Sequence, residues 1–221
     1  MREPRISLTA GRTGTGKSHY AAWELEEYAQ QSVKNPFIVL DMKPLNHIGL
    51  AALPRAKAII IKKNTQRLNW KRIIQENPRL VVVKGKGVEL ETIISIYTQI
   101  MQICYDNYAG QHVLIEEAHN FAGLHDTIEP VKQLVLEGRG AGISVQFVTP
   151  HIQDFSKTVY REAELIIGKT LTQQDIEYFK GTIPNYENLN TQLKKYEFIK
   201  RTQEGETSIV RAGKRTTKHY G

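Results

Sequence analysis

A glycine-rich segment constrains the fold more than any other part of this sequence. It reads Gly11-Arg12-Thr13-Gly14-Thr15-Gly16-Lys17-Ser18 and matches the phosphate-binding P-loop pattern G-x-x-x-x-G-K-[ST] in full. An apolar run, Ile6–Ala10, precedes it and predicts a strand, and apolar residues at helical spacing follow from Ser18 to about Gln31. An ordinary glycine-rich turn is the alternative, and the strand before and the helix after disfavour it.

Each part of this segment has a physical task in binding a nucleotide. The three glycines can adopt backbone conformations that point successive N–H groups at a phosphate, and the helix directs its positive end at the same anion. Lys17 is expected to neutralise the β- and γ-phosphates, and the Ser18 hydroxyl to bind Mg²⁺. The sequence therefore predicts that residues 11–18 bind ATP together with Mg²⁺.

A second motif supplies acids. Val113-Leu-Ile-Glu116-Glu117-Ala-His119 is an apolar strand that ends in two carboxylates, and such a strand places them at the carboxyl edge of a sheet, beside the P-loop. Glu116 fits the Walker B acid that holds the metal and its waters, and Glu117 fits the residue that orients the attacking water. Paired acids favour hydrolysis over transfer to another nucleotide. The alternative is that both are solvated acids at the start of a loop.

Short apolar runs alternate with helical patterns along the chain, which predicts an α/β fold with a mostly parallel sheet and helices on both faces. The longest helix is expected from about Glu89 to Tyr108, with Gly110 ending it. The C-terminal strands flank the turn-forming Gln203-Glu-Gly and predict a hairpin. The other expected strands are Phe37 to Asp41, Ala58–Ile61 and Leu80–Val83 (both buried), Val113–Ile115, Ile143–Thr149 and Leu165–Ile167, and the other expected helix is about Ile128 to Glu137.

Composition limits the function classes. The length suits a single domain, 1–221, and no apolar run approaches the ~20 residues needed to span a bilayer. The single cysteine, Cys104, cannot form an internal disulfide and is expected in the core, so we expect the cytoplasm of a host cell, or a virion assembled there. The net charge of +7 favours a polyanionic partner without demanding one.

Several segments together resemble the HerA–FtsK superfamily of P-loop ATPases. The P-loop, the acid pair and the segment Glu137-Gly-Arg139 to Thr149 fall in the order and spacing of that superfamily. A strand that ends in Leu40-Asp41-Met-Lys43 and the ending Ala163 to Leu171 with its hairpin are similar too. The resemblance implies a RecA-like, ASCE-type fold and a ring-shaped homo-oligomer, a hexamer or pentamer, around double-stranded DNA. The lack of extra domains favours the virus genome-packaging branch, with capsid or capsid-vertex proteins as further partners.

The resemblance also assigns roles near the two ends of the segment Glu137 to Thr149. Arg139 matches an arginine finger that reaches the ATP of a neighbouring subunit, and a solvated arginine at a helix end is the alternative. The superfamily's Thr-Gln sensor of the γ-phosphate is altered, because Pro150 follows Thr149. Sensing must then pass to His151 or Gln153, or be weakened; a plain strand-to-helix corner is the other interpretation.

Three weaker signals remain open. Asp41 is either a second acid at the nucleotide edge or a turn residue. The basic stretch Lys62, Lys63, Arg67, Lys71 and Arg72, with Trp70 among them, either follows a phosphate backbone or is a solvated face. Residues 210–221 predict a mobile basic tail that either contacts DNA or keeps the protein soluble. His112 and His119 lack partners at metal-ligand spacing, so zinc is unsupported.

The motifs predict an ATP- and Mg²⁺-dependent enzyme, and the resemblance implies a DNA translocase that packages a viral genome. A plasmid conjugation or mobilisation ATPase is one rival. A nucleotide-binding assembly protein with little turnover is the other, and the intact Lys17, Ser18 and Glu117 count against it.

Overall fold

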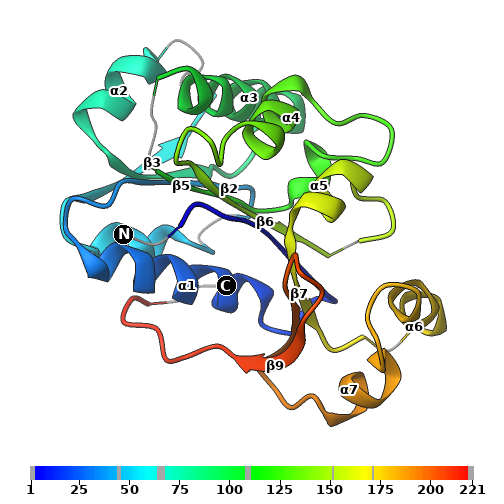
Figure 1. The fold of residues 1–221 in the computed structure, drawn as a ribbon. Coiled ribbons are helices and arrows are strands. Elements are labelled where there is room, and N and C mark those ends of the chain that lie inside the picture. Colours follow the sequence, from blue (N-terminus) through cyan, green and yellow to red (C-terminus); the bar gives the residue numbers. More distant parts are fainter. Residues whose placement is uncertain are drawn as a thin grey trace.

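A mostly parallel β-sheet forms the centre of the molecule (Figure 1). The computed structural model describes residues 3–43, 46–63, 68–107, 111–150, 152–170 and 172–218. Within these ranges a nine-stranded sheet has the order β3-β4-β2-β5-β6-β1-β7-β8-β9, in which β8 is antiparallel to both β7 and β9 and the other neighbours are parallel. The α/β fold, the mostly parallel sheet and the C-terminal hairpin predicted from the sequence are confirmed.

The element bounds are close to those expected from the apolar runs. The strands are β1 (Ile6–Ala10), β2 (Phe37–Asp41), β3 (Ala56–Ile61), β4 (Arg79–Lys84), β5 (His112–Ile115), β6 (Ser144–Thr149), β7 (Glu164–Gly168), β8 (Glu197–Arg201) and β9 (Thr207–Arg211). The helices are α1 (Lys17–Gln31), α2 (Trp70–Glu76), α3 (Leu90–Asn107), α4 (Glu129–Leu136), α5 (Lys157–Glu162), α6 (Gln173–Lys180) and α7 (Tyr186–Gln192), with short 3₁₀ helices η1 (Ile48–Ala52) and η3 (Ala118–Asn120).

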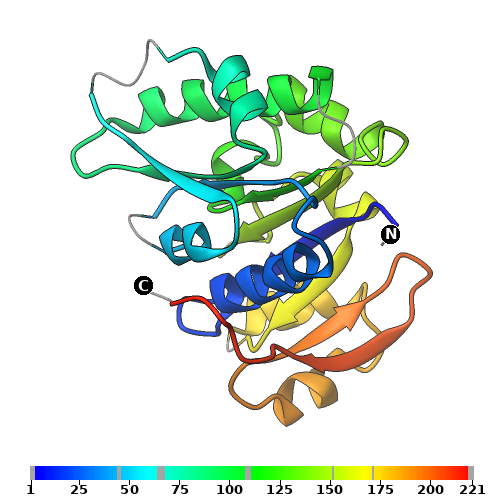
Figure 2. The same ribbon diagram turned by 90° about the vertical axis from the view of Figure 1, so that its left-hand side faces the viewer.

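The two faces of the sheet bury two separate cores. Successive side chains of a strand point to opposite faces, so Ile38 and Leu40 of β2 join the core under α2 to α5, whereas Phe37 and Val39 join the core under α1. Figures 1 and 2 show α2, α3, α4 and α5 on one face of the sheet and α1 on the other. Strands buried on both faces need apolar residues throughout, which is why their sequences read as continuous apolar runs.

The strand order places the candidate site. Strand β6 lies between β1, which precedes the P-loop, and β5, which precedes the acid pair, as the RecA-like, ASCE-type fold class requires. In register, Ala10 pairs with Thr149 and Ile115 pairs with Phe147. The carboxyl ends of these three parallel strands therefore meet at one edge of the sheet, with the P-loop and the acid pair beside each other.

Some expectations from the sequence differ from the structure. The run Ala58–Ile61 lies in β3, at the edge of the described sheet beside β4, where Ala58 and Ile60 are exposed and Ile61 is buried. Leu90, expected on the buried side of the long helix, is 46% exposed in its first turn. The helices α2, α5, α6 and α7 were not predicted. The expected helix end at Tyr108 and Gly110 lies outside the described residues.

The C-terminal segment was expected to be a mobile tail from residue 210, and the structure differs. Val210 and Arg211 belong to β9, and residues 212–218 pack along α1. The Arg215 guanidinium is buried against Glu26 of α1, with Nε 2.9 Å from Oε1. The backbone N–H of Thr216 donates to the same carboxylate at 2.6 Å. A buried acid on α1 therefore holds this segment in place.

Three further points bear on the sequence predictions. Cys104 is fully buried in α3, and burial raises the pKa of its thiol to about 12, as expected of a core residue. Trp70 is buried in the core, so it is not available to a base or phosphate beside Lys71 and Arg72. No helix in the described ranges is both long and apolar enough to cross a bilayer.

Candidate nucleotide-binding and catalytic site

The P-loop connects β1 to α1 through a turn that only glycine can make comfortably. Gly16, the N-cap of α1, has a φ of 93°, and a Cβ there would lie 2.5 Å from the ring of Tyr196. Gly11 and Gly14 also have positive φ, at 142° and 86°. The loop is closed by Thr15, whose hydroxyl donates to the Arg12 carbonyl at 2.8 Å. The sequence pattern thus has the loop shape that phosphate binding needs.

Lys17 lies at the start of α1 and is nearly buried. Its ammonium donates to the Arg12 carbonyl at 2.8 Å, which folds the side chain back over the loop. Burial, helped by the neighbouring ammonium of Lys43, lowers the pKa of Lys17 to about 8, although Glu116 and Glu117 act in the opposite direction. A desolvated ammonium at the helix N-terminus is a strong site for a phosphate.

Glu116, the first residue after β5, is buried and held on two sides. The Glu116 Oε1 accepts a hydrogen bond from His47 Nε2 at 2.8 Å, and its carboxylate also accepts from the Ser18 hydroxyl. Burial alone would raise the pKa of Glu116, but the hydrogen bonds from His47 and Ser18 outweigh it and lower the pKa to about 2. Glu116 therefore stays charged although it is 1% exposed.

Glu117 turns away from its neighbour. Its backbone is left-handed, with a φ of 49°, which is uncommon for a residue with a side chain and costs roughly 1–2 kcal/mol. The two adjacent carboxylates have different nearest partners, His47 and Ser18 for Glu116 and Lys43 for Glu117. The Glu117 side chain forms an ion pair with Lys43, and Nδ1 of His119 lies 3.5 Å from its other oxygen. Backbone strain of this kind gathers at functional sites.

The residues after β2 complete the site, and Asp41 fixes them. Its two carboxylate oxygens accept from the backbone N–H groups of Lys43, at 3.1 Å, and of His47, at 2.7 Å. Burial raises the pKa of Asp41 to about 6, although these bonds favour its charged form. Asp41 is thus a turn residue and also a structural acid at the nucleotide edge, so both interpretations of the sequence describe part of its position.

Sequence reasoning missed His47 as a site residue, and it gave Lys43 no role. Neither lies in a motif with a known spacing from the P-loop. The pattern Leu40-Asp41-Met-Lys43 was the only available signal, since it places Lys43 at the carboxyl end of a buried strand. His47 carried no signal, because its approach to Glu116 depends on how the chain turns after β2.

The donors fit Mg²⁺. The hydroxyl of Ser18 and the carboxylate of Glu116 are hydrogen-bonded neighbours, and both are the hard oxygen ligands that Mg²⁺ prefers. In the described part of the chain no cluster of three or more His, Cys, Asp or Glu residues is placed to hold a metal. Two protein oxygens fit an ion that binds through one or two protein ligands, substrate phosphates and water.

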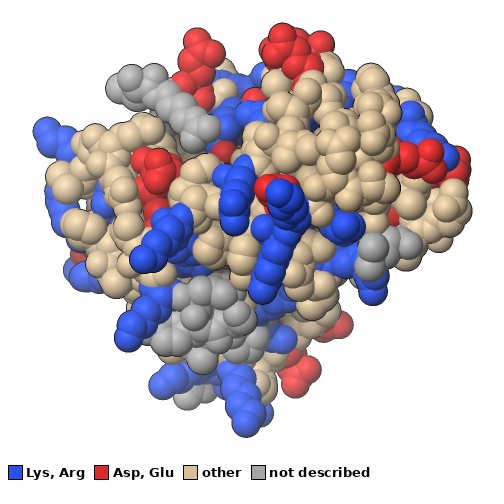
Figure 3. Space-filling model, turned by 90° about the horizontal axis from the view of Figure 1, so that it is seen from below, with Lys and Arg blue, Asp and Glu red and all other residues tan. Residues whose placement is uncertain are grey.

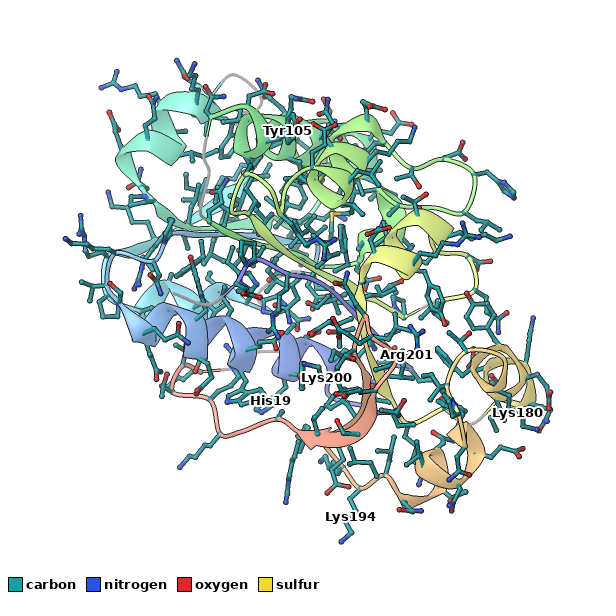
Figure 4. The ribbon with its side chains drawn as sticks, viewed as in Figure 1. His19, Tyr105, Lys180, Lys194, Lys200 and Arg201 are labelled. Carbon is teal, nitrogen blue, oxygen red and sulfur yellow. The ribbon has the colours of Figure 1, made fainter. Side chains whose placement is uncertain are left out.

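Two cavities meet at the P-loop. One, of about 450 Å³, is lined by Gly16, Lys17 and Ser18 together with Lys43 and Asn46. The other, of about 500 Å³, lies between Arg12–Thr15 and the segment Leu193–Glu197 that leads into β8. Tyr196 lines both, and its ring packs at a tilt against that of His19, with 5.0 Å between the ring centroids. Figure 4 shows His19 on α1, beside the C-terminal segment.

Arg139 lies at the other edge of the sheet. It precedes β6, and Val145 of β6 pairs with Ile6 at the start of β1, so the length of β1, about 15 Å at the usual rise per residue, separates it from the P-loop. Its guanidinium donates to Gln203 of the hairpin turn at 2.7 Å and lies 3.6 Å from a Glu162 oxygen. The side chain is 43% exposed. The structure does not bring Arg139 to the P-loop of its own subunit.

Two of the three candidate sensor residues, Thr149 and Gln153, lie in the described part of the chain. Thr149 is buried at the end of β6, beside Ala10. Gln153 faces α6 instead, where its side-chain amide donates to Asp175 at 3.1 Å. His151 lies outside the described residues.

Known proteins resemble this chain in structure and not in sequence. No protein-family model matches the sequence, and no curated protein sequence matches it. The fold is similar to that of the genome packaging NTPase B204 from Sulfolobus turreted icosahedral virus 2, with a TM-score of 0.72 at 16% identity over 95% of this chain and 96% of that one. It is also similar to the bacterial conjugative coupling protein TrwBdeltaN70, with a TM-score of 0.68 at 11% identity over 98% and 87% of the two chains.

This chain shares its fold with that genome packaging NTPase and with that conjugative coupling protein. The resemblance predicted from the P-loop, the acid pair and the Arg139 segment is therefore confirmed for the fold. The B204 protein has been solved with ATP-gammaS, with AMP and with AMPPCP. Another B204 structure is described as the DNA-packaging ATPase from Sulfolobus Turreted Icosahedral Virus, and it matches with a TM-score of 0.67 at 17% identity over 94% of this chain and 98% of that one.

Proposed function

We propose that this protein is an ATP-driven translocase of double-stranded DNA that packages a viral genome into a preformed capsid in the host cytoplasm. One observation carries the proposal. A P-loop with a desolvated Lys17 and a strand that ends in Glu116 and Glu117 meet at one sheet edge, in a fold shared over nearly the whole chain with a genome-packaging NTPase.

The chemistry follows from the positions of the side chains. Lys17 and the N–H groups of the P-loop bind the β- and γ-phosphates of ATP. Ser18 and Glu116 hold Mg²⁺, which when bound supplies neutralising charge at the phosphates. Glu117 orients a water for attack on the γ-phosphate, since its carboxylate is separate from the Glu116 contacts with His47 and Ser18. His47 keeps Glu116 charged and in place.

The position of Arg139 supports a ring. An arginine about one strand length from its own P-loop can serve as a finger only for the ATP of another subunit, so the proposed motor is a homo-oligomer such as a hexamer or pentamer. Gln203 and Glu162 contact the guanidinium itself, and because the side chain is 43% exposed it can exchange these contacts for the nucleotide of a partner. A helix-end arginine without function remains the alternative.

Duplex DNA is the proposed polyanionic partner. Figure 3 shows that Lys and Arg side chains gather over the lower face of the molecule. On this side, the segment that leads into β8 carries the exposed residues Lys194 and Lys195, and the end of β9 with the segment after it carries Arg211, Lys214 and Lys218. Lys194 lies at the lower end of the molecule in Figure 4. Because such contacts go to phosphates, binding should depend on salt and not on base sequence.

The test of packaging is made on particles. Virus carrying Lys17→Ala should assemble capsids that are empty of genome, because the proposed motor acts on a capsid that is already formed. Lys132→Ala, at an exposed lysine of α4, is the matched control and should give full particles. Electron microscopy and quantification of packaged DNA provide the readout. Full particles in normal yield from Lys17→Ala would reject the packaging role.

A conjugation or mobilisation ATPase is the second candidate. The similarity to the conjugative coupling protein, over 98% of this chain, favours it. The same Lys17→Ala variant would then block plasmid transfer and leave particles unaffected. An assembly protein with little turnover would bind ATP and hydrolyse it only slowly, without stimulation by DNA.

A further inference from the structure

The phosphate cavity contains a second lysine that the P-loop pattern does not supply. Lys43 follows β2 and lines the same cavity of about 450 Å³ as Gly16, Lys17 and Ser18. Its ammonium lies close enough to that of Lys17 for the two charges to oppose each other. Two ammonium groups at one cavity form a site for a ligand with several negative charges, such as a triphosphate.

Lys43 is paired with the carboxylate that hydrolysis needs. Its Nζ forms an ion pair with Glu117 Oε1, and His119 Nδ1 lies 3.5 Å from Oε2. A carboxylate held by a cation is a weaker acceptor for a proton of the attacking water. With its side chain in this position, Glu117 is not free to orient a water.

The Lys43 side chain can move while its backbone stays fixed. Asp41 accepts from the backbone N–H groups of Lys43 and His47 and so holds the chain after β2. The Lys43 side chain is 41% exposed and has four rotatable bonds, so changing its partner needs no rearrangement of the core. Glu116 differs, because His47 and Ser18 hold it in a buried position.

We propose that Lys43 is a second phosphate-binding lysine that exchanges the carboxylate of Glu117 for the γ-phosphate of ATP. No covalent bond changes in this step; one ion pair replaces another. The γ-phosphate carries more negative charge than a single carboxylate, and ADP lacks it. ATP therefore frees Glu117 to orient water, whereas ADP leaves the Lys43–Glu117 pair intact.

This exchange would detect the γ-phosphate through Lys43, and not through the sensor residues expected after β6. Pro150 has no backbone N–H to donate, and Gln153 is hydrogen-bonded to Asp175 of α6. Lys43 instead connects the γ-phosphate position with the water-orienting residue. The inference rests on the proposed ATP hydrolysis and adds how the site distinguishes ATP from ADP.

The test compares the affinities for ATPγS and ADP by isothermal titration calorimetry. Lys43→Met keeps most of the side-chain volume and removes the charge, and it should weaken ATPγS binding about 10-fold or more while ADP binding changes less than about 2-fold. Lys43→Arg should retain a preference for ATPγS. Lys200→Met is the matched control, because Lys200 also pairs with an acid, Glu164, at 3.1 Å, but on β8.

A double-mutant cycle tests the exchange itself. Glu117→Gln removes the competing carboxylate, so it should raise the affinity for ATPγS. The factor by which it raises this affinity should be at least about 5-fold smaller in the Lys43→Met background than in the wild-type background. Equal losses of ATPγS and ADP affinity in Lys43→Met, or the same effect of Glu117→Gln in both backgrounds, would overturn the role of Lys43 and leave ATP binding intact. A wild-type protein that binds neither nucleotide would overturn the proposed function as well.

Discussion

His47 and Glu116 form a fully buried pair, with 2.8 Å between the imidazole Nε2 and the carboxylate Oε1. His47 lies in the turn after β2 and Glu116 follows β5, 69 residues later, and the two meet because β2 and β5 are neighbours in the sheet. The pair holds the proposed metal-binding acid in one orientation. Partners that orient a metal ligand typically contribute 10–100-fold to metal affinity.

We therefore expect His47→Ala to raise the Mg²⁺ concentration needed for ATPγS binding by about 10-fold or more, because Glu116 loses the donor that orients it. Titration of Mg²⁺ at fixed ATPγS measures this. His125→Ala, at an exposed loop histidine, is the control and should leave the midpoint unchanged. An unaltered midpoint in His47→Ala would show that His47 does not act on the metal site.

The pKa of Lys17 predicts a proton-linked step in nucleotide binding. Burial and Lys43 lower this pKa to about 8, so below pH 8 the ammonium is charged and above it the amine is neutral. The bound phosphate favours the charged form. Binding of ATPγS at pH 9 should therefore take up a proton, and affinity should fall as the pH rises above 8. The raised pKa of Lys43 keeps that lysine charged over this range, although its burial acts in the other direction.

Calorimetry at pH 9 in buffers of different ionisation enthalpy measures the proton uptake. Lys17→Arg is the control. An arginine is already charged at pH 9, so ATPγS binding to this variant should take up no proton at this position. Equal binding enthalpies in all buffers for the wild-type protein would contradict the assignment.

Arg139 should act across a subunit boundary. Its contacts are with Gln203 and Glu162, away from the P-loop of its own chain. Arg139→Ala is expected to lower the turnover by roughly 10³–10⁵. Arg161→Ala, at an exposed arginine of α5, should not.

Mixing Arg139→Ala subunits with Lys17→Ala subunits should restore part of the activity, because some interfaces then join an intact P-loop to an intact finger. ATP hydrolysis by mixed rings is the measurement. Mixed rings that recover nothing, or a wild-type monomer with full activity, would refute the role in a neighbouring site.

The C-terminal segment should contribute to stability through one buried ion pair. Glu26 accepts from Arg215, Thr216 and Thr217, and these bonds lower its pKa although burial alone would raise it. Arg215→Ala leaves the Glu26 carboxylate buried without its cation, so the free energy of unfolding should fall by about 3 kcal/mol. Urea denaturation measures the change.

Two further variants make this prediction specific. Lys214→Ala, at the exposed neighbouring residue, should change the free energy of unfolding little. The double variant Glu26→Leu with Arg215→Met should recover most of the loss, because it removes both buried charges. The same stability in Arg215→Ala as in the wild type would mean that this segment does not hold to α1.

The strands and the P-loop could be predicted from the sequence because their signals are local. A buried strand needs an apolar run, and the P-loop needs glycines where the backbone turns. His47 and the ordered C-terminal segment could not be predicted, since each depends on an acid far away in the sequence. The basic residues 211–218 have the composition of a mobile tail, and only the structure shows that Arg215 is bound to Glu26 of α1. The exposure of β3 could not be predicted either. Its apolar run resembles that of a central strand, and only the order of strands in the sheet shows that β3 lies at the edge.

ATP-driven movement along DNA is the central claim, and displacement of a triplex-forming strand measures it most directly. Wild-type protein with ATP and Mg²⁺ should strip a third strand from a linear duplex of arbitrary sequence. Glu117→Gln should bind ATP and displace nothing, and ATPγS should not support displacement by the wild type. A wild-type protein that hydrolyses ATP in the presence of the duplex but leaves the third strand bound would contradict translocation.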